Sequence, residues 1–217
     1  MKGLLIKDFR LLKNQKSFLL TFLLIGVGML FTELDSFLII SYLTFLFSAF
    51  AVSSISYDEL DNGFAFLFTL PVSRRGYVAE KYLFGLLFGG GAWFISTLLT
   101  TVIAAFRQEE GLLEIFPAVF VYLVMILIYL SIVLPIQLKF GVEKGRLIIL
   151  GTVILIYLAG FLLTRGLRYL NAHENIYLAG ALKENYVAAA VVFAAVSIVL
   201  FVLSYALSVH IMEKKQV

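Results

Sequence analysis

The chain has 217 residues, of which 62% are hydrophobic and 14% are charged, and its formal net charge is +3. Soluble globular chains carry about 25% charged residues, and a soluble core of this size does not hold so many apolar side chains. The composition therefore excludes a soluble enzyme, a disordered chain and a nucleic-acid-binding protein. The chain has no cysteine, so it has no disulfide framework and no thiolate metal site. We interpret it as an all-α integral membrane protein.

Six charge-free apolar runs of 16 to 25 residues follow one another along the chain. A helix of about 20 such residues crosses the apolar core of a bilayer, and none of the runs alternates apolar and polar residues as a membrane β-strand does. We therefore expect six transmembrane helices in one transmembrane domain that covers residues 1–217. The predicted spans are 17–32, 36–56, 82–106, 115–138, 147–164 and 187–211.

The basic residues predict the orientation of these spans. Segments 1–16, 57–82, 139–146 and 212–217 hold 13 of the 17 lysines and arginines. Short loops that are rich in Lys and Arg face the cytoplasm. We therefore expect a multi-pass protein of the cell membrane with both termini in the cytoplasm. An even number of spans agrees with this, because it places both termini on one side.

The first 16 residues form a basic segment ahead of the first span. Leu5, Phe9 and Leu12 recur at i, i+4 and i+7, the spacing of one helix face. The segment is either an interfacial helix in the inner headgroup layer or a basic flank that only sets the topology. The first apolar run ends without a small-x-small cleavage site, so we do not expect a cleaved signal peptide.

Motifs for catalysis and nucleotide binding do not occur in the sequence. It contains no G-x-x-x-x-G-K-[ST], no H-E-x-x-H and no G-x-S-x-G. The predicted spans also contain no Asp, Glu, Lys or Arg, whereas an ion-driven carrier usually keeps an ionisable group at membrane depth. We therefore expect no catalytic site, cofactor or metal on this chain, and an energy source on a separate protein.

The longest predicted cytoplasmic connection, 57–81, has an amphipathic pattern. Leu60, Phe64, Leu67 and Phe68 recur at i, i+4, i+7 and i+8 after an acidic start, which predicts a short helix over 58–70. Pro71 ends this helix, because proline disfavours the helical conformation of the residue before it. Ser73 is then a suitable N-cap for a second helix that runs through Tyr77 and Lys81 into the third span.

The aromatic face of this short helix either rests on the inner leaflet or docks in a groove of a cytoplasmic partner, which is a common use of amphipathic helices. We favour the partner. The residues expected to bind it are Asp58, Glu59, Leu60, Phe64, Phe66, Leu67, Phe68, Leu70, Pro71, Arg74 and Arg75.

The sequence in this region resembles a known family of membrane proteins. The pattern consists of Asp58-Glu59, Gly63, Thr69-Leu-Pro-Val-Ser-Arg74, Tyr77 and Lys81-Tyr82. It is similar to that of bacterial ABC transporter permeases of the type-2 exporter class, and more narrowly to the small six-span permeases of phenol-soluble-modulin exporters. The opening sequence MKGLLIKDFR, with Lys7-Asp8, also resembles this group.

The resemblance implies that residues 1–16 form an elbow helix on the inner membrane face, and that 58–70 is a coupling helix that seats in a separate P-loop ABC ATPase. It also implies two permeases and two ATPases in the working unit, with ATP and Mg²⁺ bound by the ATPase. The substrate varies within this class from peptides to lipids, drugs and ions. The charge-poor interior of this chain favours an amphipathic or lipophilic one.

Glycines and prolines indicate where the spans pack or bend. Gly85 and Gly89 form a G-x-x-x-G motif, which permits close helix packing, and we favour packing within one subunit over packing between two. Gly89, Gly90 and Gly91 together lower helix propensity, and Pro135 is a candidate kink. The predicted outer loop, 165–186, is either an outer gate or an interfacial cap.

Two alternatives remain at this point. The first is a carrier or flippase without an ATPase, but the predicted spans lack the ionisable group that an ion-driven carrier usually needs. An intramembrane enzyme lacks support from any paired acidic, His or Ser/Lys residues within the spans, whereas the sequence does not exclude an assembly factor. We favour the permease subunit of an ATP-driven exporter that acts as a homodimer.

Overall fold

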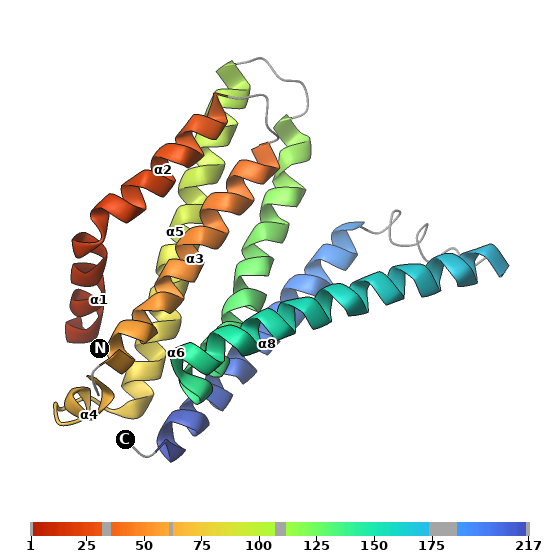
Figure 1. Cartoon of the computed structure of the whole chain (residues 1–217). Coiled ribbons are helices and arrows are strands. Elements are labelled where there is room, and N and C mark those ends of the chain that lie inside the picture. Colours follow the sequence, from red (N-terminus) through yellow and green to blue (C-terminus); the bar gives the residue numbers. More distant parts are fainter. Residues whose placement is uncertain (1, 32–35, 61–62, 107–111, 174–185, 216–217) are drawn as a thin grey trace.

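The computed structural model describes residues 2–31, 36–60, 63–106, 112–173 and 186–215. Within these ranges the chain forms helices and no strand, which confirms the all-α prediction. The helices are α1 (Lys2–Asn14), α2 (Lys16–Leu30), α3 (Ser36–Glu59), α4 (Gly63–Leu67), α5 (Arg74–Phe106), α6 (Leu112–His173) and α8 (Tyr186–Lys214). Figure 1 shows that α1, α4, the start of α5 and the end of α8 gather at one end of the bundle, here called the terminal end.

Four stretches of the described residues are long and apolar enough to cross a membrane: Leu38–Glu59, Arg74–Phe106, Val119–Gly141 and Ala190–Lys214. They correspond to the second, third, fourth and sixth predicted spans. The first predicted span coincides with α2, whose apolar part, Lys16–Met29, is shorter. The fifth predicted span, 147–164, lies within α6, but most of its side chains lie outside the described residues. The count of six stays a prediction.

The third span begins earlier than its apolar run. Helix α5 starts at Arg74 and continues without interruption to Phe106, so the helix predicted after Ser73 runs through Tyr77 and Lys81 into the third span. The N-cap prediction for Ser73 is confirmed, because the Gly76 N–H donates to Ser73 Oγ at 3.1 Å and the Tyr77 N–H donates to the Ser73 carbonyl at 2.9 Å. The charged residues Glu80 and Lys81 lie within α5 and do not interrupt it, because both side chains are buried against neighbouring helices.

The continuous helix predicted over 58–70 does not form, which corrects that expectation. Helix α3 instead continues through Asp58 to Glu59, and α4 covers only Gly63–Leu67. Asp58 stays on α3 because Tyr77 and Lys81 of α5 bind its carboxylate there. A turn in which the Val72 N–H donates to the Leu70 carbonyl at 2.6 Å then leads past Pro71 into α5.

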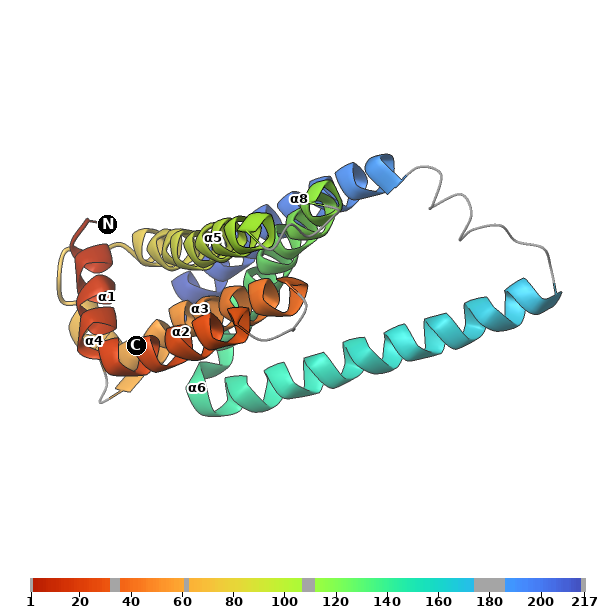
Figure 2. The same ribbon diagram turned by 90° about the horizontal axis from the view of Figure 1, so that it is seen from above.

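Helix α6 consists of two limbs that meet at Gly141. This residue has φ 74° and ψ −176°, a conformation that glycine adopts at little cost. The predicted connection 139–146 is thus reduced to one non-helical residue, and the break lies beyond Pro135, the predicted kink. Figures 1 and 2 show the second limb leaving the bundle formed by α3, α5, the first limb and α8. The second limb runs to His173, inside the predicted outer loop, while 174–185 lie outside the described residues.

The core of the bundle lies between α3, α5, the first limb of α6 and α8. Ile55, Val78, Leu130 and Leu134 are fully or almost fully buried there. Close packing needs glycine on α5: a Cβ on Gly85 would lie 2.9 Å from the side chain of Leu130, whereas none of the described atoms lies within 4 Å of one on Gly90 or Gly91. The G-x-x-x-G motif therefore serves packing within this chain, and α5 remains helical through its three glycines.

Candidate functional site at the terminal end

Lys81 of α5 lies at the centre of a buried group of charged side chains. Its Nζ is 2.5 Å from Asp8 Oδ2 of α1 and 2.8 Å from Asp58 Oδ2 at the end of α3. It also donates a hydrogen bond to Ser54 Oγ at 3.0 Å. The Lys81 side chain is only 1% exposed. A single ammonium group thus joins three helices that are far apart in the sequence.

Three further side chains complete this group. Lys7 Nζ donates to Asp58 Oδ1 and lies 3.2 Å from Asp8 Oδ1, and Tyr77 OH donates to Asp58 Oδ2 at 3.0 Å. Glu80 is buried beside Lys81, with Oε2 at 3.7 Å from its Nζ. The set of seven is called the ionic cluster below and consists of Lys7, Asp8, Ser54, Asp58, Tyr77, Glu80 and Lys81.

The charges of the ionic cluster depend on one another. Burial alone would raise the pKa of Asp8, but Lys81 and Lys7 beside it outweigh this effect, and the pKa lies below the usual value. Asp8 is therefore ionised at neutral pH. A buried ion pair contributes little net stability, but removal of one partner costs about 3–5 kcal/mol because a charge is left without its partner. The cluster therefore requires α1, α3 and α5 to stay together.

Helix α4 has one face on the core and one face outside. The Phe64 side chain is 5% exposed, its ring meets that of Tyr77 edge to face at 5.6 Å, and Lys215 Nζ lies 4.7 Å from its centroid. By contrast, Phe66 is 70% exposed, and Leu60 and Leu70 beside the helix are also exposed. These three exposed side chains, Leu60, Phe66 and Leu70, are called the α4 ridge.

The start of α5 is tied to the end of α8. The Arg74 guanidinium donates to the carbonyls of Met212, Glu213 and Lys215 at 2.8–3.0 Å. Carbonyls at a helix C-terminus lack intrahelical partners and carry partial negative charge. Arg74 therefore supplies both hydrogen-bond donors and a positive charge at the end of α8. Lys215 in turn donates to the Leu138 carbonyl of α6 at 3.1 Å. Displacement of α4 and the start of α5 therefore acts on α6 and α8 as well.

A pocket of about 630 Å³ lies between α3 and α6. Its walls are mainly apolar and aromatic, with hydroxyl groups of α3 among them. The buried Thr44 Oγ1 has no hydrogen-bond partner among the described residues. Pockets of this size and lining accept small amphipathic or lipophilic molecules. In the described part of the chain, no three His, Asp or Glu side chains come together in a way that would hold a metal ion.

One family of known proteins matches nearly the whole chain. The model of the ABC-2 family transporter protein matches residues 3–213. The chain belongs to the ABC-2 transporter family. No curated protein and no solved structure matches it. Membership identifies this ABC-2 protein as a multi-pass membrane component and, in general, implies an ABC ATPase as its partner.

The ABC-2 chain uses many of the predicted partner-binding residues internally. Asp58 belongs to the ionic cluster, and Phe64 and Leu67 belong to the core. Glu59 lies 3.5 Å from Lys215 Nζ, and Phe68 is half-buried against Tyr77 and Arg74. The predicted residues that remain exposed are Leu60, Phe66, Leu70, Pro71 and Arg75, of which Arg75 pairs with Glu213 at 2.7 Å.

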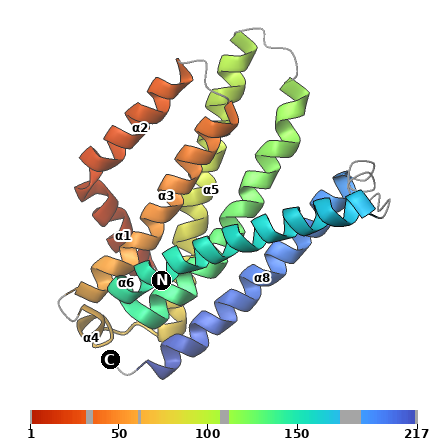
Figure 3. The same cartoon turned by 45° about the vertical axis from the view of Figure 1, so that its right-hand side comes forward.

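The predicted interfacial stripe on α1 is partly turned toward the protein. Leu12 is buried, Leu5 is half-buried, and Phe9 is 49% exposed with its ring 5.6 Å from that of Phe84. The buried face instead follows Leu4, Asp8 and Leu12, because Asp8 pairs with Lys81. Figures 2 and 3 show the chain turning sharply between α1 and α2.

The sequence did not predict the ionic cluster, although the motifs of the family resemblance contain five of its members: Lys7, Asp8, Asp58, Tyr77 and Lys81. One signal was present: Tyr77 and Lys81 lie at i and i+4, which places them on one helix face. Ser54 and Glu80 carried no such signal. Their role follows only from the contacts of α3 and α5.

Proposed function

We propose that this ABC-2 protein is the membrane-spanning permease subunit of an ATP-driven exporter. It moves an amphipathic or lipophilic substrate, such as a membrane-active peptide, out of the cell. A separate P-loop ATPase binds ATP and Mg²⁺ and supplies the energy, and this chain contributes no catalytic group. The main support for this proposal is the α4 ridge. Its apolar side chains are exposed, while the other face of the same segment packs against α5.

The contacts of α4 supply a mechanical route. An ATPase that binds Phe66 displaces α4 and therefore also Phe64, which lies on the same helix. The Phe64 ring contacts Tyr77 of α5 directly. Tyr77 is hydrogen-bonded to Asp58, so a displacement of α5 also displaces α3 and, through the ion pairs of Lys81, α1. The hydrogen bonds of Arg74 transmit the displacement to α8. In this mechanism α5 tilts as a long lever while the ionic cluster keeps the terminal ends of the helices together.

The remaining features of the proposal concern topology and assembly. The terminal end faces the cytoplasm, because segments 1–16, 57–82, 139–146 and 212–217 are rich in Lys and Arg. The second limb of α6 is the fifth of six spans, and its exposed Leu147, Leu150 and Ile154 support packing against lipid or a second permease in a homodimer. The pocket between α3 and α6 supports a lipophilic substrate. These features agree with the small six-span kind of exporter permease.

Co-purification with a candidate ABC ATPase from the same organism tests the proposal. Phe66→Ala removes the most exposed ring of the α4 ridge, and Phe106→Ala removes an 83% exposed ring at the opposite end of the bundle. An interface hot spot is worth about 2 kcal/mol or more, so we expect Phe66→Ala to weaken ATPase binding about 30-fold. We expect Phe106→Ala to bind like the wild type. Equal binding by both variants would disprove the role of the ridge.

A further inference from the structure

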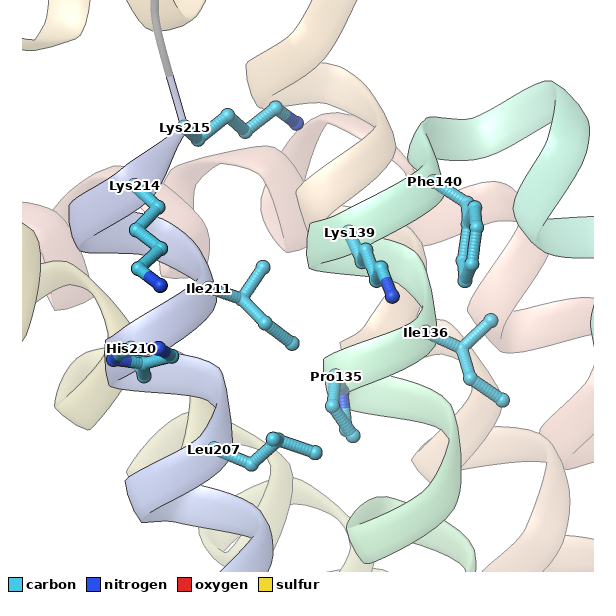
Figure 4. A pocket seen from close by; sticks show the side chains of 9 residues that line it. All are labelled: Pro135, Ile136, Lys139, Phe140, Leu207, His210, Ile211, Lys214 and Lys215. Atoms are coloured by element: carbon cyan, nitrogen blue, oxygen red, sulfur yellow. The ribbon is translucent and has the colours of Figure 1, made fainter.

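A second pocket, of about 520 Å³, opens between α6 and α8 at the terminal end. Figure 4 shows side chains of the two helices facing each other across it. Helix α6 contributes Pro135, Ile136 and Lys139, and α8 contributes Leu207, Ile211 and Lys214. The α4 ridge does not line this pocket, so the proposed ATPase contact leaves it unexplained.

The lysines of this pocket are not neutralised by the rest of the described chain. Neither Lys139 nor Lys214 forms an ion pair with a described side chain, and Lys139 lies over the ring of its neighbour Phe140 at 5.0 Å. Lys215 differs, because its Nζ is bound to the Leu138 carbonyl and lies 3.5 Å from Glu59. Two ammonium groups therefore remain at the pocket, with His210 beside them.

The polarity of the pocket changes along the helix axes. On α6 the apolar Pro135 and Ile136 come one turn before Lys139, and on α8 Leu207 and Ile211 come before Lys214. Both helices run toward the terminal end here (Figure 1). The pocket is thus apolar toward the middle of the bundle and basic at its end. The gradient follows the direction in which these candidate spans would cross a bilayer.

We propose that the pocket binds an anionic phospholipid, with its phosphate on Lys139 and Lys214 and its acyl chains along the apolar side chains deeper in the pocket. Basic pockets between membrane helices attract anionic headgroups, and apolar surface of the pocket matches the chains. A free phosphate would leave the apolar half of the pocket unused. The placement in the inner leaflet rests on the proposed cytoplasmic position of the terminal end.

Lipid binding by the purified full-length chain in detergent tests this site without ATPase or nucleotide. The probes are dioleoylphosphatidylglycerol and dioleoylphosphatidylcholine, with bound lipid counted by native mass spectrometry. We expect the wild type to prefer phosphatidylglycerol and Lys139→Gln/Lys214→Gln to bind it about 30-fold more weakly, from the usual contribution of two lysines. Lys139→Arg/Lys214→Arg keeps the charges and is expected to retain binding.

The matched control is Lys2→Gln/Lys13→Gln, which removes two exposed lysines of α1 outside the pocket and is expected to bind phosphatidylglycerol normally. Equal loss in this control would mean non-specific attraction and overturn the proposal. Displacement of the lipid by inorganic phosphate would also overturn it, because the pocket would then take a soluble anion. The unfolding temperature of each lipid-free variant shows whether it is folded. A failed ATPase contact leaves all these results unaffected, so the two proposals are tested separately.

Discussion

Asp8 Oδ2 of α1 and Lys81 Nζ of α5 lie 2.5 Å apart, and neither side chain is more than 1% exposed. The pair attaches the N-terminal helix to the long helix that starts beside α4. An interfacial helix in contact with lipid alone could change its orientation about its connection to α2. The ion pair instead makes α1 part of the same mechanical unit as α3 and α5.

Replacement of Lys81 by methionine is expected to lower the free energy of unfolding by about 3–5 kcal/mol, because the buried Asp8 and Asp58 then keep only the half-buried Lys7 as a described cationic neighbour. Methionine keeps most of the side-chain volume, so the change reports the lost charge and not a cavity. Thermal unfolding in detergent measures the effect. Lys13→Met, an exposed change on α1, is the control, and a similar result for both variants would contradict the buried position of Lys81.

The lowered pKa of Asp8 predicts a pH dependence with a definite sign. A carboxyl group whose pKa is lower in the folded protein stabilises the fold above its usual pKa, here 3.8, and this contribution is lost as the pH falls through the lowered value. We therefore expect Asp8→Asn to be less stable than the wild type at neutral pH. The difference between their unfolding temperatures should narrow as the pH falls below 3.8, whereas a difference that stays constant there would contradict the shift.

Much of the helix arrangement could be predicted from the sequence, because bilayer thickness fixes the length of apolar runs. Not every helix boundary could be predicted in this way. Hydropathy alone placed the start of the third span near Tyr82, whereas the N-cap pattern at Ser73 correctly predicted the helix that begins at Arg74. The sequence predicted a connection over 139–146 between the fourth and fifth spans, and the break at Gly141 lies within it. The sequence did not predict that the break would be a single residue with positive φ.

The sequence predicted a short amphipathic helix before α5 but not which of its side chains the rest of the chain covers. The spacing placed Leu60 and Phe64 on one face, whereas Leu60 is exposed outside α4 and Phe64 is buried. Pro71 and Ser73 correctly marked the boundary with α5. Periodicity does not say which face a protein core already covers, so Phe64 was assigned to a partner although Tyr77 covers it. The pairing of Asp58 was not predicted for the same reason, because its partner Lys81 lies on another helix.

Gly141→Ala is expected to destabilise the protein by more than 1 kcal/mol. Alanine at φ 74° is strained, and its Cβ would lie within 3 Å of the Glu59 carboxylate. Gly151→Ala in the second limb of α6 is the matched control, because no described atom lies within 4 Å of its Cβ position. A glycine in a helix interior costs about 0.5–1 kcal/mol relative to alanine, so this variant should be slightly more stable. Differential scanning fluorimetry distinguishes the two, and a stabilised Gly141→Ala would refute the assigned backbone conformation.

Phe64 and Phe66 are two residues apart in the sequence but are expected to respond in opposite ways to truncation. Phe64 is 5% exposed and Phe66 is 70% exposed. Truncation of a buried phenylalanine costs about 3–5 kcal/mol, so Phe64→Ala should lower the unfolding temperature of the isolated permease, and its ATPase binding should fall only because less folded protein is present. Surface truncations stay within about 0.5 kcal/mol, so Phe66→Ala should unfold like the wild type and yet bind the ATPase poorly. Stability and ATPase binding measured on the same two preparations separate these effects. A stable Phe64→Ala variant with lost ATPase binding would mean that Phe64, and not Phe66, is the side chain that the partner grips.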